Sequence, residues 1–142
     1  MSLLETASLV AYAAHYGQTD NSGIPYIEHP RKVASFLSDE RDKVLAMLHD
    51  VIEDTFLTEG DLRPVFGDDI VDTLLILTKG EGEDYFDYIG RITGNQSAIR
   101  VKMADIKHNS DMTRISNPTQ RDFDRLAKYK KAEEILRAAL ES

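Results

Sequence analysis

Apolar residues recur at intervals of three and four along most of this chain, which is the spacing of one face of an α-helix. The first such stripe consists of Leu3, Leu4, Ala7, Val10, Ala11 and Ala14. Strict alternation of apolar and polar residues, the pattern of a half-buried strand, appears nowhere, although residues 74–77 alone also fit a buried strand. The pattern therefore predicts an all-α fold with about seven or eight helices.

Turn-forming residues indicate where the expected helices begin and end. The first helix ends near Gly17, and a loop rich in turn formers follows over residues 18–25. Pro30 fits the first turn of the next helix, and Thr58 is a typical residue at a helix start. The remaining apolar stripes predict helices over residues 30–37, 44–52, 58–66, 70–78, 86–92, 98–108 and 119–140, with a break at 80–83.

Length and composition exclude several classes of protein. The 142 residues contain no repeat, low-complexity tract or linker, so we expect one domain over residues 1–142. A net charge of −8 argues against a nucleic-acid polymer as partner. The absence of cysteine excludes disulfides, thiolate metal sites and a cysteine nucleophile. No apolar run suits a membrane span or a signal peptide, so we expect a cytoplasmic protein; nothing indicates an oligomeric state.

The segment from His49 to Asp54 places one imidazole and three carboxylates within two turns of a predicted helix. Helical spacing would put His49 over Glu53 and Asp50 over Asp54. Negative charges are unfavourable near a helix C-terminus, and a bound divalent cation would offset that cost. The alternative is a solvated acidic helix end with a buried, hydrogen-bonded histidine. The His-Asp pair alone does not decide between them, so further ligands are needed.

Two other segments supply further ligands. His29 directly precedes Pro30 at a helix entrance, and Asp105 lies on an otherwise apolar helix face, where a buried carboxylate needs a partner. His29, His49, Asp50 and Asp105 form a mixed nitrogen and oxygen set that suits one divalent ion such as Mn²⁺, Fe²⁺ or Zn²⁺. These four residues are the candidate metal ligands.

The two remaining histidines give weaker signals. His15 lies close to the loop over residues 18–25, and lining a pocket and capping a helix are equally good interpretations. His108 follows Asp105 by three residues, a position typical of a surface residue or of one that supports the metal ligands.

The motifs and their order resemble the HD-superfamily hydrolase domain of the bifunctional alarmone synthetase/hydrolases, above all the small stand-alone form typified by the metazoan SpoT homologue. The resemblance extends from about residue 5 to residue 138, and the His-Asp-x-x-Glu-Asp core followed by Thr55 is its most specific part. The other matching segments are residues 14–18, 23–30, 66–67, 77–79, 101–105, 108–109 and 128–132.

The resemblance implies an HD-type helical bundle with one Mn²⁺ as its cofactor. In that family, the positions matching His29, His49, Asp50 and Asp105 hold the ion. The positions matching Glu53 and Asp54 activate the attacking water, and the reaction removes the whole 3′-pyrophosphate of ppGpp or pppGpp. The resemblance also implies substrate contacts for four residues, Ser22, Asn109, Arg125 and Tyr129.

The loop over residues 18–23 departs from the family pattern. The family reads Gln-x-Arg-Lys-Ser-Gly there, whereas this chain has Asp20 and Asn21 in place of the Arg-Lys pair. A guanidinium that stacks on the base and a lysine that contacts phosphate are both lost. We therefore expect poorer binding of a highly charged alarmone, or a preference for a less charged nucleotide.

Taken with the resemblance, the residues favour a metal-dependent phosphohydrolase acting on a small phosphorylated nucleotide, with guanosine 3′,5′-bis(diphosphate) as the first candidate. NADPH and nucleoside mono- or triphosphates are alternative substrates. A different class of function is a catalytically weak or silent regulatory module that binds a metal and a nucleotide. The presence of both Glu53 and Asp54 favours the enzyme, because a binding module does not need them. A purely structural domain would make four well-placed ligands a coincidence.

Overall fold

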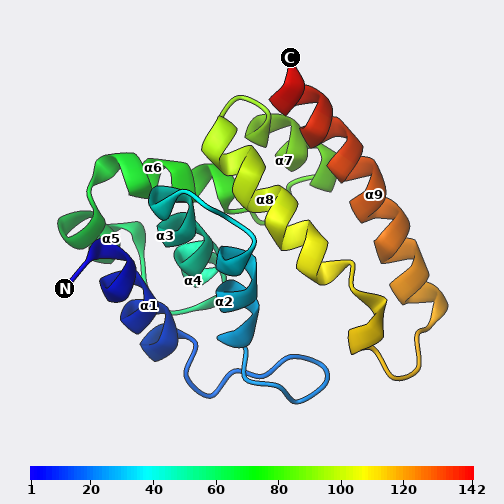
Figure 1. Cartoon of the computed structure of the whole chain (residues 1–142), viewed down its shortest axis with the longest axis horizontal. Helices are drawn as coiled ribbons and strands as arrows, with labels where there is room; N and C mark the ends of the chain where they lie inside the picture. The colour runs from blue at the N-terminus through cyan, green and yellow to red at the C-terminus, as the bar shows by residue number, and fades with distance from the viewer.

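Helices form almost all of the regular structure in a computed structural model that describes residues 1–142 (Figure 1). Their order is α1 (Leu3–Ala14), α2 (Glu28–Ser35), α3 (Glu40–Leu48), α4 (Val51–Asp54), α5 (Glu59–Phe66), α6 (Asp68–Leu77), α7 (Tyr85–Ile92), α8 (Gln96–Asn109), the short 3₁₀ helix η1 (Met112–Arg114) and α9 (Gln120–Glu141). The only extended pairing is one isolated bridge between Thr19 and Pro25. The predicted all-α class is confirmed, and residues 74–77 belong to α6 rather than to a strand.

Side-chain caps explain where several helices begin. Ser2, Thr58 and Thr119 each form a reciprocal capping box at the start of α1, α5 and α9, which satisfies backbone N–H groups that have no partner inside the helix. Thr58 therefore marks a helix start, as its sequence context predicts. None of the helices combines the length and the apolar character that crossing a membrane requires.

The predicted continuous helix over residues 44–52 is interrupted. α3 ends at Leu48, and Asp50 leaves the helical conformation with φ −102° and ψ 0° before the single turn of α4. The His49 ring offers a local reason, because its Nδ1 donates to the carbonyl of Ala46 at 2.6 Å. The His49 backbone N–H also turns to Ala46, three residues back instead of four. The expectation of one helix through this segment was wrong.

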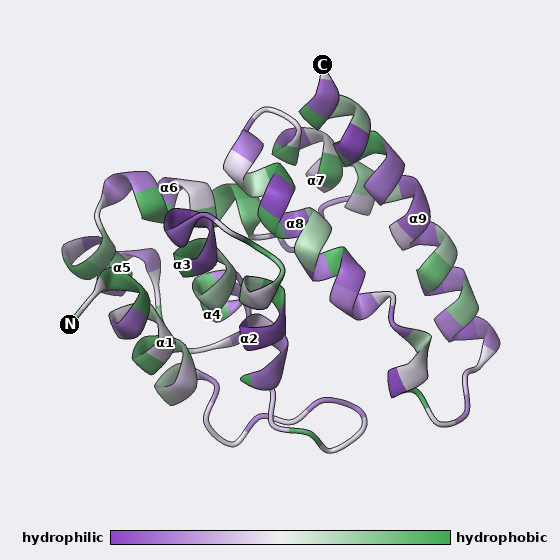
Figure 2. Ribbon diagram, viewed as in Figure 1, coloured by the Kyte–Doolittle hydropathy of each residue, from purple (hydrophilic) through white to green (hydrophobic).

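α3 lies at the centre of the molecule and packs against α1, α2, α6 and α8. Its last five residues, 44–48, are all buried within one cluster of 28 buried apolar side chains. α9 packs along α8 and α7 at one side of the molecule and alternates between hydrophilic and hydrophobic residues along its length (Figures 1 and 2). The C-terminal end of α3 is therefore held on several sides by other helices.

A buried ion pair connects α3 to α8. Asp42 is only 2% exposed, and its carboxylate accepts a hydrogen bond from Arg100 Nε at 2.6 Å. Replacing Arg100 with leucine leaves that buried carboxylate without its cation, so we expect the free energy of unfolding to fall by about 1–3 kcal/mol. Urea unfolding measures this change as a lower midpoint at constant slope.

Arg137→Leu is the matched control, because it removes an Arg–Glu133 pair that lies at the surface of α9. Exposed ion pairs contribute little to stability, so this variant should unfold close to the parent protein. Equal effects of the two substitutions would contradict a special role for the buried pair.

Candidate metal centre and substrate pocket

Four side chains from three segments converge on one point inside the bundle. His29 comes from the first turn of α2, His49 and Asp50 from the break between α3 and α4, and Asp105 from the middle of α8. His29 Nε2 lies 2.8 Å from Asp105 Oδ1, and His49 Nε2 lies 3.0 Å from Asp50 Oδ2. The two pairs are also close to each other. His49 Nε2 lies 3.3 Å from Asp105 Oδ1, and His29 Nε2 lies 3.8 Å from Asp50 Oδ2. The structure thus brings together all four predicted ligand residues.

The break after α3 makes this convergence geometrically feasible. Neighbouring residues in a regular helix point about 100° apart, so they rarely share a ligand position. Because Asp50 is not helical, its carboxylate turns back to the ring of the preceding residue, His49. A local departure from the helix thereby aims two adjacent side chains at one centre.

The hydrogen bonding of His49 fits a cation. Its Nδ1 donates to the Ala46 carbonyl, which leaves the lone pair of Nε2 facing the carboxylates of Asp50 and Asp105. This Nε2 is buried and has no hydrogen-bond partner in the protein. A histidine that donates through one ring nitrogen to a backbone carbonyl and presents the other beside carboxylates has the usual arrangement of a metal ligand. The residues present therefore fit a divalent ion.

Neighbouring groups keep the two carboxylates charged. Burial alone raises the pKa of Asp105, but Lys102, whose Nζ lies 2.8 Å from Oδ2, and the two histidines lower it well below its usual range. Burial also raises the pKa of Asp50, but the adjacent His49 and the Tyr26 hydroxyl, which donates to Oδ2, bring it down to about 2. No sequence pattern singles out Tyr26 or Lys102, although each lies three residues before a candidate ligand.

His108 supports His29 directly. The two rings stack with centroids 5.0 Å apart, and their Nδ1 atoms are 2.7 Å apart. Burial, followed by the nearby charges of Arg114 and His29, lowers the pKa of His108 to about 4, so its ring is neutral at neutral pH. The sequence left open whether His108 is a surface residue or one that supports the metal ligands. The structure favours the second interpretation, because His108 orients the candidate ligand His29.

The structure agrees with both interpretations of His15, as a residue that lines a pocket and as the cap of a helix. His15 is the residue at the C-terminal end of α1, and its buried side chain lines a cavity of about 390 Å³ against the loop that follows. His15 Nδ1 contacts Gln18 Oε1 at 2.8 Å, and Gln18 Nε2 donates to the backbone carbonyl of Asp54 at 2.9 Å. These contacts connect the end of α1 to the end of α4.

Glu53 and Asp54 lie beside Asp50 at the mouth of the centre, with one oxygen of each carboxylate within 4.8 Å of the others. A continuous helix that stacks His49 over Glu53 does not explain the grouping of these carboxylates, because the helix is broken between His49 and Glu53. Glu53 Oε1 accepts a hydrogen bond from the Lys79 backbone N–H at 2.9 Å. Partial burial, followed by the neighbouring Asp50 carboxylate, raises the pKa of Asp54, and burial also raises that of Glu53 despite the Lys79 bond. Both groups are thus made more basic than ordinary carboxylates.

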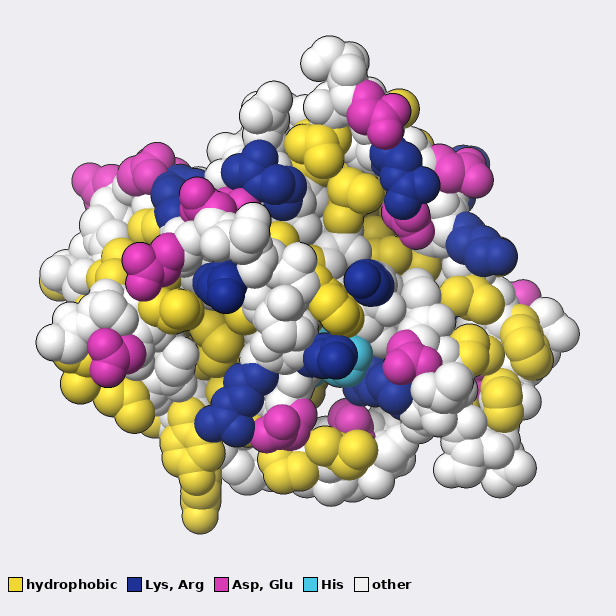
Figure 3. Space-filling view, in the orientation of Figure 1, with side chains coloured by type: hydrophobic (Ala, Val, Ile, Leu, Met, Phe, Trp, Pro, Cys, Tyr) yellow, Lys and Arg dark blue, Asp and Glu magenta, His cyan; other side chains and the backbone are white.

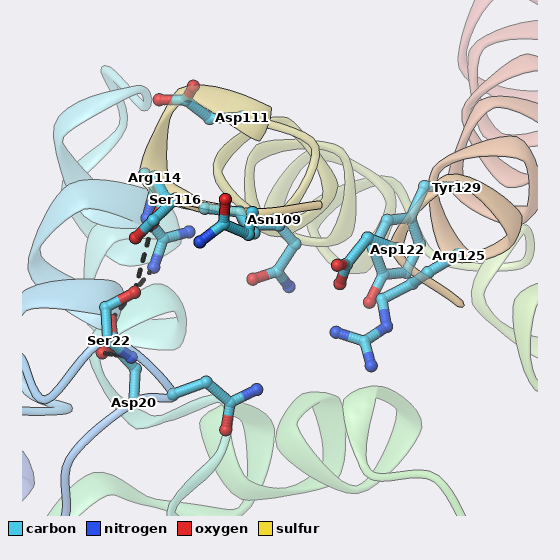
Figure 4. Close-up of a pocket in the computed structure, with 12 residues that line it drawn as sticks. Asp20, Ser22, Asn109, Asp111, Arg114, Ser116, Asp122, Arg125 and Tyr129 are labelled. Atoms are coloured by element: carbon cyan, nitrogen blue, oxygen red, sulfur yellow. Dashed lines mark hydrogen bonds and ion pairs between the residues drawn. The ribbon is translucent and has the colours of Figure 1, made fainter. Parts of the chain in front are cut away.

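A polar cavity of about 470 Å³ opens next to this centre, between the loop after α1, the segment after α8 and the first turns of α9 (Figure 4). Figure 3 shows this face hollowed below α8, with acidic and basic side chains gathered around the hollow. All four predicted substrate residues, Ser22, Asn109, Arg125 and Tyr129, line the cavity. Asn109 connects it to the centre, because its Nδ2 donates to Asp105 Oδ1 at 3.1 Å.

Sequence comparison finds bacterial relatives of much greater length. The chain is 36% identical over 121 residues to the bifunctional (p)ppGpp synthase/hydrolase SpoT of Escherichia coli, an alignment that covers 75% of this chain and 17% of that protein. It is 32% identical over 127 residues to a GTP pyrophosphokinase of Myxococcus xanthus, covering 77% of this chain and 17% of the relative. The aligned region therefore spans about one sixth of the curated relatives. No protein-family model matches the chain.

Structural comparison extends the likeness over the whole chain. The solved structure of a metazoan ortholog of SpoT, described as hydrolysing ppGpp, superposes with a TM-score of 0.79 at 22% identity and covers 99% of this chain and 93% of that one. A crystal structure from Listeria monocytogenes gives a TM-score of 0.63 at 25% identity, covering 82% and 83%. The first likeness establishes the fold, and the bacterial alignments add the sequence relationship. The aligned part of the chain is therefore related in sequence to SpoT-type proteins, and the chain has the fold of the metazoan SpoT ortholog.

Proposed function

We propose that this protein is a metal-dependent pyrophosphohydrolase that removes the 3′-pyrophosphate of guanosine 3′,5′-bis(diphosphate). The observation that carries the proposal is the convergence of His29, His49, Asp50 and Asp105 beside a polar cavity of nucleotide size. The relatives support it, because proteins 36% identical to this chain bear the name guanosine-3′,5′-bis(diphosphate) 3′-pyrophosphohydrolase.

The same four side chains would hold one divalent ion. Their mixture of imidazole and carboxylate ligands suits Mn²⁺, with Fe²⁺ and Zn²⁺ as alternatives. When bound, such an ion polarises a phosphoryl oxygen and lowers the pKa of coordinated water toward neutrality. Three neighbours keep the ligands in position: Tyr26 holds Asp50, Lys102 holds Asp105, and His108 holds His29.

Glu53 and Asp54 are the groups suited to activate the attacking water. Their raised pKa values make them better proton acceptors than ordinary carboxylates. The Lys79 N–H fixes the orientation of Glu53, which suits it to align a water molecule. Asp54 lacks such an anchor and is free to take the proton. The water oxygen bonds to the phosphorus next to the 3′-oxygen, and the bond from this phosphorus to the 3′-oxygen breaks. The 3′-oxygen departs and takes up a proton to become the ribose hydroxyl, and the water oxygen is released as part of the intact pyrophosphate.

The second candidate is a regulatory module that binds the nucleotide with little or no turnover. Asp20 and Asn21, which stand where the family has Arg and Lys, favour this candidate or a less charged substrate such as NADPH or a nucleoside mono- or triphosphate. The arrangement of Glu53 and Asp54 beside Asp50 favours catalysis. One buried apolar cluster supports a single domain over residues 1–142, and a cytoplasmic location stays a prediction from sequence.

A nucleotide panel with added Mn²⁺ tests the proposed function. Incubation with ppGpp should release pyrophosphate and leave GDP, both measured by ion-exchange chromatography, while NADPH, GTP and GMP serve as competing candidates. Chelation should abolish the activity, and Mn²⁺ should restore it. Turnover of another nucleotide with none of ppGpp would overturn the substrate assignment, and binding without any turnover would favour the regulatory module.

A further inference from the structure

Two guanidinium groups supply the positive charge of the substrate cavity. Arg114 and Arg125 are the only basic side chains that line it, and they enter from opposite sides (Figure 4). Arg125 comes from α9 and extends toward the middle of the cavity. Arg114 lies at the end of η1, next to the loop that carries Asp20 and Ser22. Nothing in the sequence pattern singles out Arg114.

The acidic side chains of the cavity are engaged with backbone N–H groups. Asp20 Oδ1 accepts from the N–H groups of Ser22 at 2.8 Å and Ile24 at 3.0 Å, so it organises the turn of its own loop. In the same way, Asp122 accepts from the Thr119 N–H at 2.8 Å at the start of α9. The Asp20 carboxylate is therefore held by the backbone of its own loop.

Arg114 is fixed to this loop through both its backbone and its side chain. The Ser22 hydroxyl donates to the Arg114 carbonyl at 3.1 Å, and Arg114 Nη1 donates to the His108 carbonyl at 3.0 Å. The contact from Arg114 Nη2 to Asp20 Oδ2 is long, at 3.5 Å. A guanidinium has five N–H donors, and these contacts leave most of them free to bind another acceptor. The loop that carries Asp20 and Ser22 thus holds the Arg114 guanidinium beside the cavity, although the loop has no basic residue of its own.

We propose that Arg114 is a specificity-determining residue that binds a phosphate group of the substrate, in place of the cations missing at Asp20 and Asn21. Phosphate is the ligand expected between two guanidinium groups, because their fork of donors matches its oxygens. Arg114 would contact it from the side of the loop, and Arg125 from the side of α9. This inference rests on the proposed function and deepens it, because it explains how a loop without Arg or Lys still serves a polyanionic substrate.

Substitution of Arg114 tests the inference in two measurements. Arg114→Gln should raise the KM for ppGpp roughly tenfold or more and change kcat much less, since a charge-assisted hydrogen bond to the bound substrate is lost. Arg114→Lys, which keeps the charge, should recover part of the loss. Calorimetric titration of ppGpp into the Mn²⁺-loaded Glu53→Gln/Asp54→Asn protein, where turnover is suppressed, should show a matching increase in Kd when Arg114→Gln is added.

Two further variants separate a local contact from a general charge effect. Arg121→Gln removes the same charge from an exposed position one turn before Arg125 and outside the cavity lining, so it should change Kd little. Asp20→Asn keeps the acceptor for the turn and releases Arg114, so it should tighten binding, and by a smaller factor when Arg114→Gln is also present. Equal Kd values for Arg114→Gln and Arg121→Gln would overturn the inference even if the protein hydrolyses ppGpp.

Failure of the proposed function gives a different result. If the parent protein neither binds nor hydrolyses ppGpp, inorganic pyrophosphate becomes the probe in the same titrations. Weaker pyrophosphate binding by Arg114→Gln than by Arg121→Gln would support the anion site although the proposed substrate is wrong. No difference between the two would overturn the inference. Should Arg114→Gln fail to fold, Arg114→Lys and Asp20→Asn carry the same comparison, and unchanged binding in both would overturn it.

Discussion

Replacing Asp105 with alanine is expected to abolish both metal binding and hydrolysis. Asp105 faces His29 and His49 at 2.8 and 3.3 Å, so its removal opens one side of the candidate centre. Metal content of the purified protein and pyrophosphate release from ppGpp measure the two losses. Full metal occupancy with full activity in this variant would contradict the assignment of Asp105 as a ligand.

The control for this experiment concerns Lys102. The Asp105 carboxylate is the ion-pair partner of that largely buried lysine, whose pKa it raises even though burial lowers it. Asp105→Ala therefore strands a buried cation and destabilises the fold by a route unrelated to the metal. The double variant Lys102→Met/Asp105→Ala removes both charges and should fold better than the single variant while still failing to bind metal. A helical circular dichroism spectrum establishes that the chain is folded.

The isosteric changes Glu53→Gln and Asp54→Asn are expected to separate catalysis from metal binding. Each should leave the ion in place and lower kcat by roughly 10²–10⁴-fold, the range for loss of an acid–base group. In Glu53→Gln the new side-chain carbonyl can still accept the hydrogen bond from the Lys79 N–H, so this change preserves local structure. Steady-state kinetics on ppGpp, together with metal analysis, gives both quantities.

The difference between the two variants is informative in itself. If Asp54 takes the proton and Glu53 only aligns the water, Asp54→Asn should have the larger effect on kcat. Glu81→Gln is a suitable control, because it removes an exposed carboxylate from the loop that follows Lys79. Wild-type kcat in both carboxamide variants would show that neither residue activates water.

Apolar spacing and capping residues were sufficient to predict most of the helices. The stripe from Leu3 to Ala14 coincides with α1, and Thr58 begins α5 as expected. The break between α3 and α4 could not be predicted, because the apolar positions continue across it. A contact from the His49 ring to the Ala46 carbonyl accompanies the break, and sequence spacing carries no information on that geometry.

The residues of the candidate site also fall into those that the sequence could predict and those that it could not. Its four candidate ligands and the two carboxylates proposed to activate water lie in short motifs, so their residue types and spacing were informative. Arg114 was missed because its contact with Asp20 joins residues 94 positions apart, and no local pattern encodes such a pair. The hydrogen bonds of Asp20 could not be predicted for a related reason. Its charge is visible in the sequence, whereas its hydrogen bonds to backbone N–H groups appear only once the loop is folded.

The candidate ligands also lie far apart in sequence, since the contact between His29 and Asp105 joins residues 76 positions apart. An unfolded chain rarely brings such distant groups together, so an ion at this centre binds the native state almost exclusively. By mass action, the free concentration of the ion would then contribute to the stability of the native state. A free ion concentration one hundred times the dissociation constant would add about 2.7 kcal/mol to the free energy of unfolding. In a cell that is starved of the ion, the chain would therefore lose this stabilisation and become more open to proteolysis, in addition to losing the proposed activity.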